Sequence, residues 1–377
     1  MLEIDMGQQT KLSRRRVITT AGAVGVIGLA GCTGGDDGDD ATSDDGNGDN
    51  GGNGGIPEGD YVLGTAGEAT AVHGGSVGLA SEVSSASDIL NINARTTPGT
   101  SANPRLLDRG EIDIAAGSDL NAWEANQGIG SYEDPVTERT MCQSAATHTV
   151  EVFLAKRDTP ELEDVEMVTD IPQDVPMTWG APGSSGYFYF QYGFEMLGLE
   201  NPVENYNLVN MNYGEIADAF RENRVDIGIY LTLSQTNLPG YIQEVESAAD
   251  MEVIEWDFTE EEMLAADNPF SYAEIDGNLF ADFRLDSVPA LSSVYTTYFP
   301  LEFNDDHVYE FLDVAMAQHE EIQQYHATVS GYGPDFAEEW MIQSDYVPIH
   351  PGAEQWYVDN DMWDDSWPSI DDYDDPR

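Results

Sequence analysis

The apolar positions that follow residue 56 alternate between strand-like runs and helix-like spacing. Residues 61–67 read as a strand that enters a small-residue turn, and apolar residues then recur three or four positions apart, as on one face of a helix. Further strands are predicted at 89–97 and 111–116, with a short helix around Leu106 and Leu107 between them. This order of strands and helices predicts parallel strands joined by crossover helices.

The middle of the chain repeats this pattern. A strand is predicted at 175–180, a Gly- and Ser-rich turn at 182–186, and then a helix whose apolar face runs from Tyr187 to Leu197. Residues 225–230 predict the next strand. Each half of the chain therefore contains a βαβ-type unit whose first turn is rich in small residues.

The last third adds a strand at 293–299 and an amphipathic helix from Val308 to Ile322. The acidic tail after Asp361 is expected to be frayed or solvated. The folded part spans some 320 residues, from Ile56 to Arg377. This is more than one ordinary hydrophobic core contains, so two lobes are expected.

The N-terminus reads as an export signal. A twin-arginine stretch, Ser13–Ile18, precedes an apolar run that ends at Leu29-Ala30-Gly31-Cys32, which resembles a lipobox. We therefore expect a twin-arginine lipoprotein signal at 1–31 and an acylated Cys32. The Gly-, Asp- and Asn-rich segment 32–56 is expected to be a disordered acidic tether. An uncleaved N-terminal anchor is the alternative, and both place the body outside the cytoplasm.

The charge balance is extreme, with 71 acidic residues against 14 basic residues and a net charge of −57. An acidic disordered chain and a globular protein adapted to molar salt are the two interpretations. The hydrophobic fraction of 41% and the aromatic fraction of 10% indicate a packed core and favour the second. The same charge excludes nucleic acid as a partner.

Cysteine and histidine usage gives no sign of a metal, a cofactor or a disulfide framework. Besides Cys32, the only cysteine is Cys142, which lies in an apolar run and is expected to be buried. The six histidines form no metal-ligand or nucleophile motif. His319 and His326 are seven positions apart and are expected to pack on one helix face. We therefore do not expect an enzyme.

Five segments in order resemble the TAXI-type solute receptors of tripartite ATP-independent periplasmic (TRAP) transporters. They are Gly64-Thr65-Ala66-Gly67, Thr97 to Leu107, Gly110 to Ile114 with Ser118-Asp119, Gly180-Ala181-Pro182-Gly183-Ser184-Ser185-Gly186, and His350-Pro351-Gly352-Ala353. The resemblance covers nearly all of 61–361. It implies a two-lobed periplasmic-binding-protein fold of type II character, an α/β fold with mostly parallel sheets flanked by helices. We place lobe I at 57–150 and 295–377 and lobe II at 151–294.

The second-lobe turn is the first candidate binding element. Gly183, Ser184, Ser185 and Gly186 open a helix, whose free N–H groups and dipole suit a carboxylate or another anion. An ordinary capped helix is the alternative, and the resemblance favours contact with a ligand. Ligands of open α/β lobes sit at the carboxyl ends of strands, where such turns lie.

The other candidates follow strand ends. Thr65 belongs to the opening turn, and Thr100 and Asn103 stand where the resemblance places ligand-binding residues, although both can simply cap the next helix. Ser118 and Asp119 follow a strand and either line the cleft or cap a helix. Tyr230 ends a second-lobe strand and either covers the ligand or packs in the core.

The first turn departs from the family pattern. The usual aromatic pair is replaced by Val72 and His73, and a carboxylate enters at Glu68. If Glu68 faces the cleft, it repels acidic solutes and favours an ammonium group. If Glu68 faces solvent, it is one more surface acid. His73 joins the candidate ligand-binding residues.

The resemblance implies capture of a small polar solute, an amino acid or a carboxylate, by closure of two lobes. The expected crossings between lobes lie near Thr149–Val152 and Val294–Phe299. The closed form would deliver the solute to a TRAP permease driven by an ion gradient. A lipid-anchored sensory binding protein has the same sequence features, and neighbouring genes for a permease or a sensor would discriminate between the two.

The charge generates a testable prediction. At about 1 M salt the Debye length is roughly 3 Å, so repulsion between surface acids is screened, whereas at low salt it pushes the fold apart. Diluting sodium chloride from molar to millimolar concentration is therefore expected to unfold the protein, as followed by circular dichroism. A melting temperature that stays constant across that range would contradict adaptation to high salt.

Overall fold

The computed structural model describes residues 56–373, apart from 69, 131, 133–135, 137–139, 183, 260–261, 264–268, 282, 284 and 343–346, and apart from the side chains of 185 and 372. The expected signal, the tether and Cys32 lie outside the described residues. Within the described part, no helix is both long enough and apolar enough to cross a membrane.

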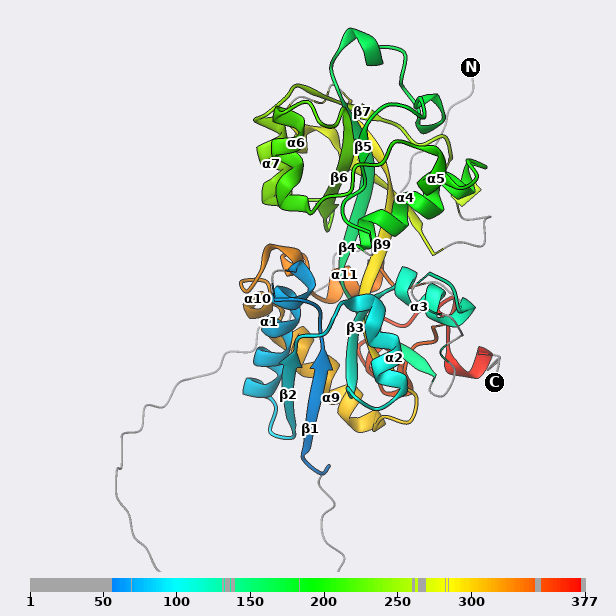
Figure 1. Cartoon of the computed structure of the whole chain (residues 1–377). Coiled ribbons are helices and arrows are strands. Elements are labelled where there is room, and N and C mark those ends of the chain that lie inside the picture. Colours follow the sequence, from blue (N-terminus) through cyan, green and yellow to red (C-terminus); the bar gives the residue numbers. More distant parts are fainter. Residues whose placement is uncertain are drawn as a thin grey trace, which may run out of the picture. The chain divides into compact units, whose positions relative to one another are not determined.

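One mixed sheet organises the described chain (Figure 1). Its main path runs β2-β1-β3-β9-β4-β6-β5, while β7 pairs with β4 and β8 pairs with β9. The strands are β1 (Gly59–Gly64), β2 (Leu90–Arg95), β3 (Ile114–Ser118), β4 (Met141–Arg157), β5 (Met177–Thr178), β6 (Ile227–Leu233), β7 (Met251–Ile254), β8 (Ser271–Asp276) and β9 (Ser287–Pro300).

Helices cover the strands on both sides in Figure 1. They are α1 (Ala71–Ala86), α2 (Asn103–Asp108), α3 (Asp119–Gln127), α4 (Ser185–Met196), α5 (Pro202–Asn205), α6 (Ile216–Arg221), α7 (Gly240–Glu246), α9 (Asp305–Ala317), α10 (His319–Ile322), α11 (Pro334–Glu339) and α12 (Pro351–Asp359). Side-chain caps fix several starts: Thr70 accepts from the His73 N–H at the start of α1, and Asn304 accepts from the His307 N–H at the start of α9.

The two longest strands, β4 and β9, run antiparallel side by side through the middle of the sheet (Figure 1). Their pairing extends from Met141 opposite Pro300 to Val152 opposite Leu291, with register shifts between Gln143 and His148. The segments Thr149–Val152 and Val294–Phe299, where crossings were expected, lie in this ladder.

The two largest hydrophobic cores lie along this ladder, and a smaller third cluster with Ala146 and Tyr298 lies on it as well. One of the two large cores contains Leu63 and Leu79 from the first strands and helices, together with Phe299 and residues of α9 and α12. The other gathers Phe153, Trp179 and Phe190 with residues of β6, β7 and α6. Each core packs around its own βαβ unit, while β4 and β9 contribute to both.

The sequence predicts the α/β class and most elements correctly. β1 pairs in parallel with β2 and β3, and β5 pairs in parallel with β6, as the strand–helix order predicted. The expectation of mostly parallel sheets is wrong. Every strand pair that includes β4 or β9 is antiparallel: β4 pairs with β6, β7 and β9, and β9 also pairs with β3 and β8. The result is a mixed sheet.

Two smaller expectations are also corrected. The tail after Asp361 is not simply solvated, because Trp367 is buried against Tyr357 with ring centroids 5.0 Å apart. His319 and His326 do not share a helix face, because α10 ends at Ile322 and His326 caps the following 3-10 turn Ala327–Val329. Cys142 is fully buried, as predicted.

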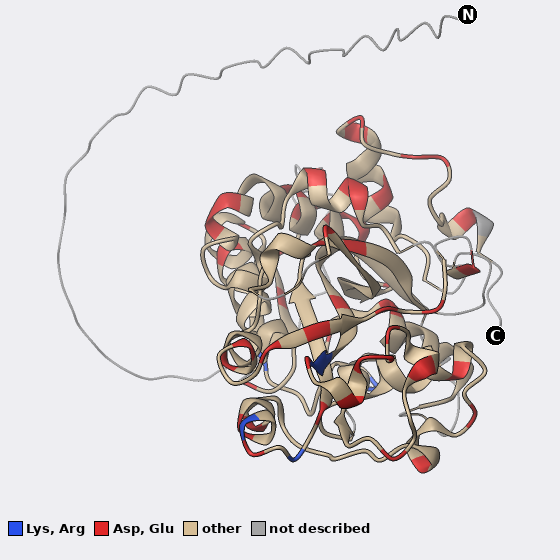
Figure 2. Cartoon of the chain, turned by 90° about the horizontal axis from the view of Figure 1, so that it is seen from above, with Lys and Arg blue, Asp and Glu red and all other residues tan. Residues whose placement is uncertain are grey.

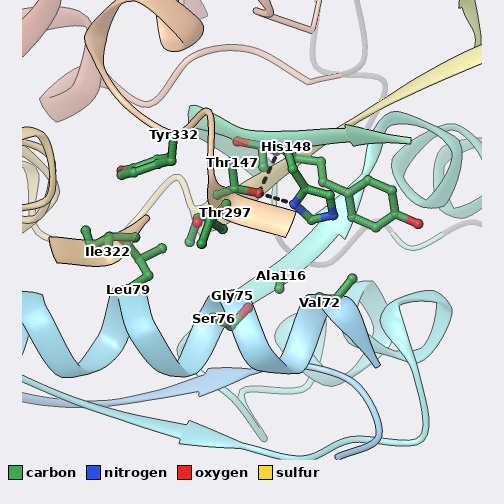
Figure 3. Close-up of a pocket in the computed structure, with 13 residues that line it drawn as sticks. Val72, Gly75, Ser76, Leu79, Ala116, Thr147, His148, Thr297, Ile322 and Tyr332 are labelled. Carbon is green, nitrogen blue, oxygen red and sulfur yellow. Dashed lines mark hydrogen bonds between the residues drawn. The ribbon is translucent and has the colours of Figure 1, made fainter. Parts of the chain in front are cut away.

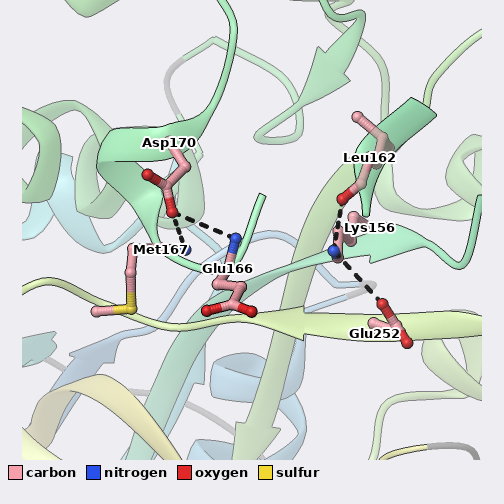
Figure 4. Close-up of polar contacts among 6 residues, drawn as sticks. All are labelled: Lys156, Leu162, Glu166, Met167, Asp170 and Glu252. Carbon is pink, nitrogen blue, oxygen red and sulfur yellow. Dashed lines mark hydrogen bonds and ion pairs between the residues drawn. The ribbon is translucent and has the colours of Figure 1, made fainter. Parts of the chain in front are cut away.

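Acidic residues occur on most helices and strands of the chain (Figure 2). The basic residue Lys156 is held by contacts with nearby residues. Lys156, at the end of β4, is buried; its Nζ donates to the Leu162 carbonyl at 2.6 Å and pairs with Glu252 at 3.4 Å (Figure 4). In the same view Asp170 accepts from the backbone N–H of Met167 at 2.9 Å. The contacts of Lys156 lie near the C-terminal end of β4, which ends at Arg157.

Candidate functional site

The turn after β1 places Thr65 beside the first turn of α1. Thr65 is fully buried, and its Oγ1 donates to the Arg95 carbonyl at 3.1 Å and lies 2.8 Å from Nδ1 of His73. His73 is half-buried, whereas Glu68 is exposed. The structure therefore brings together two of the three candidate residues of this turn.

Asn103 ties neighbouring strand ends together. Its side chain is fully buried, and Nδ2 lies 3.1, 2.6 and 2.7 Å from the carbonyl oxygens of Gly64, Thr65 and Ala116, to which it donates. Oδ1 has no hydrogen-bond partner among the described residues. Thr100, also buried, begins the 3-10 turn that precedes α2. The amide of Asn103 thus holds the ends of β1 and β3 at a fixed separation.

Ser118 and Asp119 join β3 to α3 and to β9. Ser118 forms a capping box with Asn121 at the start of α3. Asp119 is buried; its carboxylate accepts from the Val294 N–H at 2.9 Å and from the Ser293 hydroxyl. Burial raises the pKa of Asp119 to about 7, although these hydrogen bonds oppose the shift. Both residues fix α3 on the sheet.

The start of α4 carries the second-lobe candidates. Ser184 caps the helix by accepting from the Tyr187 N–H at 3.3 Å, and it also bonds the Tyr213 side chain. Gly186 is buried, and a Cβ there would lie 2.5 Å from the Tyr213 hydroxyl oxygen. Glycine is therefore required for this close packing. Gly183 and the Ser185 side chain lie outside the described residues.

Tyr230 lies in the hydrophobic core. Its ring is fully buried, with centroids 5.6, 6.2 and 5.5 Å from those of Phe153, Phe280 and Phe283. Of the two roles considered for Tyr230, the structure favours core packing.

A pocket lies between α1 and the β4–β9 ladder (Figure 3). Its lining residues are Val72, Gly75, Ser76 and Leu79 of α1, Ala116 of β3, Thr147 and His148 of β4, Tyr295, Thr296 and Thr297 of β9, and Ile322, Val329 and Tyr332. Tyr295 belongs to one hydrophobic core, Leu79 and Tyr332 belong to the other, and Val72 packs against both. The pocket therefore lies where the two cores meet.

Sequence reasoning missed the main polar residue of this pocket. His148 is 3% exposed, stacks on Tyr295 with centroids 4.5 Å apart, and lies 3.0 Å from the Thr147 hydroxyl oxygen through Nδ1. Its Nε2 has no hydrogen-bond partner among the described residues. Burial and the nearby His326 lower the pKa of His148 to about 3. No motif surrounds His148 in the sequence, so only the pairing of β4 with β9 reveals its position.

A second polar contact joins α3 to α4. The Tyr192 hydroxyl donates to Oε1 of Glu124 at 2.9 Å, and the Tyr192 ring packs edge-on against Trp123. Glu124 is fully buried, and burial raises its pKa to about 7. Tyr192 packs against the core of β6 and β7, and Trp123 packs against the same core from α3. The contact holds the start of the second βαβ unit against the end of the first.

The comparisons with known proteins define the family. A model of the NMT1-like family matches residues 63–360, and the chain belongs to this family. Among curated protein sequences none matches the chain.

Several solved structures are similar at low sequence identity. The periplasmic aliphatic sulphonate binding protein SsuA from Escherichia coli is 11% identical and has a TM-score of 0.42, over 84% of this chain and 98% of that one. MatC from Rhodopseudomonas palustris with bound malate is 10% identical (TM-score 0.41; 73% and 89% of the chains). A ligand-binding component of an ABC-type import system from Staphylococcus aureus, with zinc bound, is 11% identical (TM-score 0.39; 83% and 95%).

The hydrogen bonds of Asn103 predict that its substitution destabilises the folded protein. Asn103→Ala removes the donor of three buried carbonyl groups and is expected to lower the free energy of unfolding by about 2–4 kcal/mol. Urea unfolding in molar salt measures it. The exposed Asn93→Ala is the matched control and is expected to change stability by no more than about 0.5 kcal/mol. Equal effects of the two substitutions would show that the Asn103 amide does not hold the strand ends.

The pKa of Glu124 predicts a pH-dependent effect. Because the folded-state pKa is raised to about 7, the stability that the neutral carboxyl supplies is present at pH 4 and is lost as the pH rises through 7. Glu124→Gln is expected to raise the free energy of unfolding by about 1–3 kcal/mol at pH 8.5 and to change it little at pH 4.5. Denaturant unfolding at both pH values measures this.

The exposed Glu338→Gln is the control for the general effect of removing one acid from the chain. If Glu124→Gln and Glu338→Gln give the same increments at both pH values, the burial of Glu124 has no energetic consequence.

Proposed function

We propose that the chain is an extracytoplasmic solute-binding protein that captures a small polar solute between two lobes. One observation carries the proposal: residues of both hydrophobic cores line the pocket at the β4–β9 ladder. A solute at that place contacts both cores at once, so its binding energy favours the arrangement in which they are close.

In this proposal 57–150 and 295–377 form lobe I, and 151–294 form lobe II. The first group of candidate residues, Thr65, His73, Thr100, Asn103 and Ser118, lies at the strand ends of lobe I. Ser184 and Gly186 lie at the start of α4 in lobe II. Binding, and not catalysis, is the proposed activity of these groups. Asn103 and Ser118 support the site by holding its backbone, since their hydrogen bonds go to neighbouring main-chain groups and to a helix cap.

The partner in this proposal is a membrane permease, and the motif resemblance to TAXI-type receptors favours a TRAP permease driven by an ion gradient. The signal at 1–31, the acylated Cys32 and the tether at 32–56 would confine the receptor to the outer face of the cell membrane, near that permease. The acidic surface fits a high-salt environment. An amino acid or a carboxylate is the proposed solute class.

A thermal-shift screen in molar sodium chloride tests the binding function. The panel contains the common amino acids, malate, succinate and short aliphatic sulphonates. At least one solute is expected to raise the melting temperature with increasing concentration, because a ligand at 100 times its Kd stabilises the folded state by about 2.7 kcal/mol. A panel in which no solute raises the melting temperature would overturn the proposal.

A pocket-filling variant provides the control for the position of binding. Ala116→Leu places extra methyl groups in the pocket and is expected to abolish the shift, whereas Val77→Ala on the exposed side of α1 retains it. The melting temperature of each variant without solute shows whether it is folded. A shift that survives in folded Ala116→Leu would place the solute elsewhere.

A further inference from the structure

The hydrogen bonds of Thr147 determine which nitrogen of His148 carries the proton. Oγ1 of Thr147 lies 3.2 Å from the Tyr295 carbonyl oxygen and 3.0 Å from Nδ1 of His148. A carbonyl oxygen can only accept, and a hydroxyl has one proton to donate, so that proton goes to Tyr295. Thr147 Oγ1 must then accept from His148, which places the imidazole proton on Nδ1.

The other nitrogen, Nε2, is then a bare hydrogen-bond acceptor. The ring stays neutral over the physiological range, because burial and His326 lower the pKa of His148 to about 3. Stacking on Tyr295, with an interplanar angle of 16°, holds the ring in one orientation. Nε2 is buried and has no hydrogen-bond partner in the described part of the chain. A neutral acceptor in this position requires a donor.

Both apolar residues and hydroxyl-bearing residues line the pocket around His148. Val72 and Leu79 come from α1 and Ala116 comes from β3 (Figure 3). Ile322 and Val329 also belong to the apolar part of the lining. Apart from His148, no acidic or basic side chain is part of the described lining. Thr296, the hydroxyl residue that follows Tyr295, donates to the Ala145 carbonyl at 2.8 Å, so its proton is already used.

We propose that this pocket selects a solute that carries an uncharged N–H or O–H donor beside a small aliphatic body, and that Nε2 of His148 accepts from that donor. The inference rests on the proposed binding function and names the part of the solute that the pocket recognises. A carboxylate oxygen at the same position would face Nε2 of His148, and because both atoms are acceptors no hydrogen bond could form between them. A carboxylate of the same solute therefore has to lie away from Nε2 of His148.

The protonation of His148 can be measured directly. Protein labelled with nitrogen-15 in histidine gives a long-range proton–nitrogen spectrum in which the two neutral tautomers have different patterns, and the His148→Asn variant assigns the signal. The expected result at pH 7 is a neutral ring with its proton on Nδ1. A proton on Nε2, or a charged ring, would overturn the inference without any ligand being present.

Three probes that share one aliphatic body test the recognition. 4-Methylpentanamide carries N–H donors, its counterpart methyl 4-methylpentanoate carries none, and the 4-methylpentanoate ion carries only acceptors. Titrations in molar salt are followed by the Nε2 resonance. The amide is expected to bind at least about tenfold more tightly than the ester, because only the amide donates a hydrogen bond to the buried Nε2. The ion is expected to bind more weakly than the amide, because its carboxylate cannot donate to Nε2.

Ester or carboxylate binding as tight as amide binding would overturn the inference, and so would a failure of all three probes to bind. If a water molecule supplies the donor to Nε2 in every complex, the amide and the ester bind equally, which is again the overturning result. The amino acid and carboxylate panel decides separately whether the binding function stands.

Two substitutions of His148 separate acceptor loss from loss of packing. His148→Asn keeps an N–H donor to Thr147 but has no acceptor at the Nε2 position, and it is expected to weaken amide binding at least about tenfold. His148→Gln can place a side-chain oxygen near that position and is expected to retain affinity within about threefold. Unchanged amide affinity in folded His148→Asn would assign the donor to another partner.

If His148→Asn does not fold, Thr147→Val supplies the same test. It removes the hydroxyl that holds the proton on Nδ1, so that the tautomer shifts towards Nε2–H and amide binding weakens. Retained affinity in Thr147→Val, with the proton moved to Nε2, would overturn the inference.

Discussion

The pairing of β4 with β9 is the constraint on which the rest of the structure depends. The ladder from Met141–Pro300 to Val152–Leu291 passes through both hydrophobic cores, so each core is attached to the other by two strands that are paired over most of their length. Asp119 anchors α3 to this ladder at Val294, and Trp256 donates to the Val152 carbonyl from the other core.

The sequence predicted the helices and strands whose apolar residues recur at a regular spacing. It missed those in which buried residues follow no regular spacing. β1, α1 and α4 have one covered face, and their apolar spacing identifies them. β4 is buried along nearly its whole length and includes polar residues such as Gln143 and Glu151, so neither alternation nor a continuous apolar run marks it. Its partner β9 was predicted only from residue 293, whereas it begins at Ser287 and its first residues pair with β8.

The candidate site was predicted in the same uneven way. Turns at strand ends are visible in the sequence because they need Gly, Ser, Thr and Asn, and Thr65, Asn103, Ser118 and Ser184 all lie at such ends. Their hydrogen bonds, however, serve the main chain to a large extent, as with the three carbonyl groups that Asn103 binds. The unsatisfied acceptor of the pocket belongs to His148, which no local motif marks, because strand pairing places it beside Tyr295.

Acidic and basic charges lie away from the pocket in the described part of the chain. Acidic side chains are abundant at the surface, and the buried carboxyl groups Asp119 and Glu124 have pKa values raised by burial. The described lining of the pocket contains neither sign of charge. In concentrated salt, a charged pocket would attract inorganic counterions as well as its solute. A neutral, fixed acceptor such as Nε2 of His148 instead distinguishes solutes by the hydrogen bond they donate, and salt screens that short contact very little.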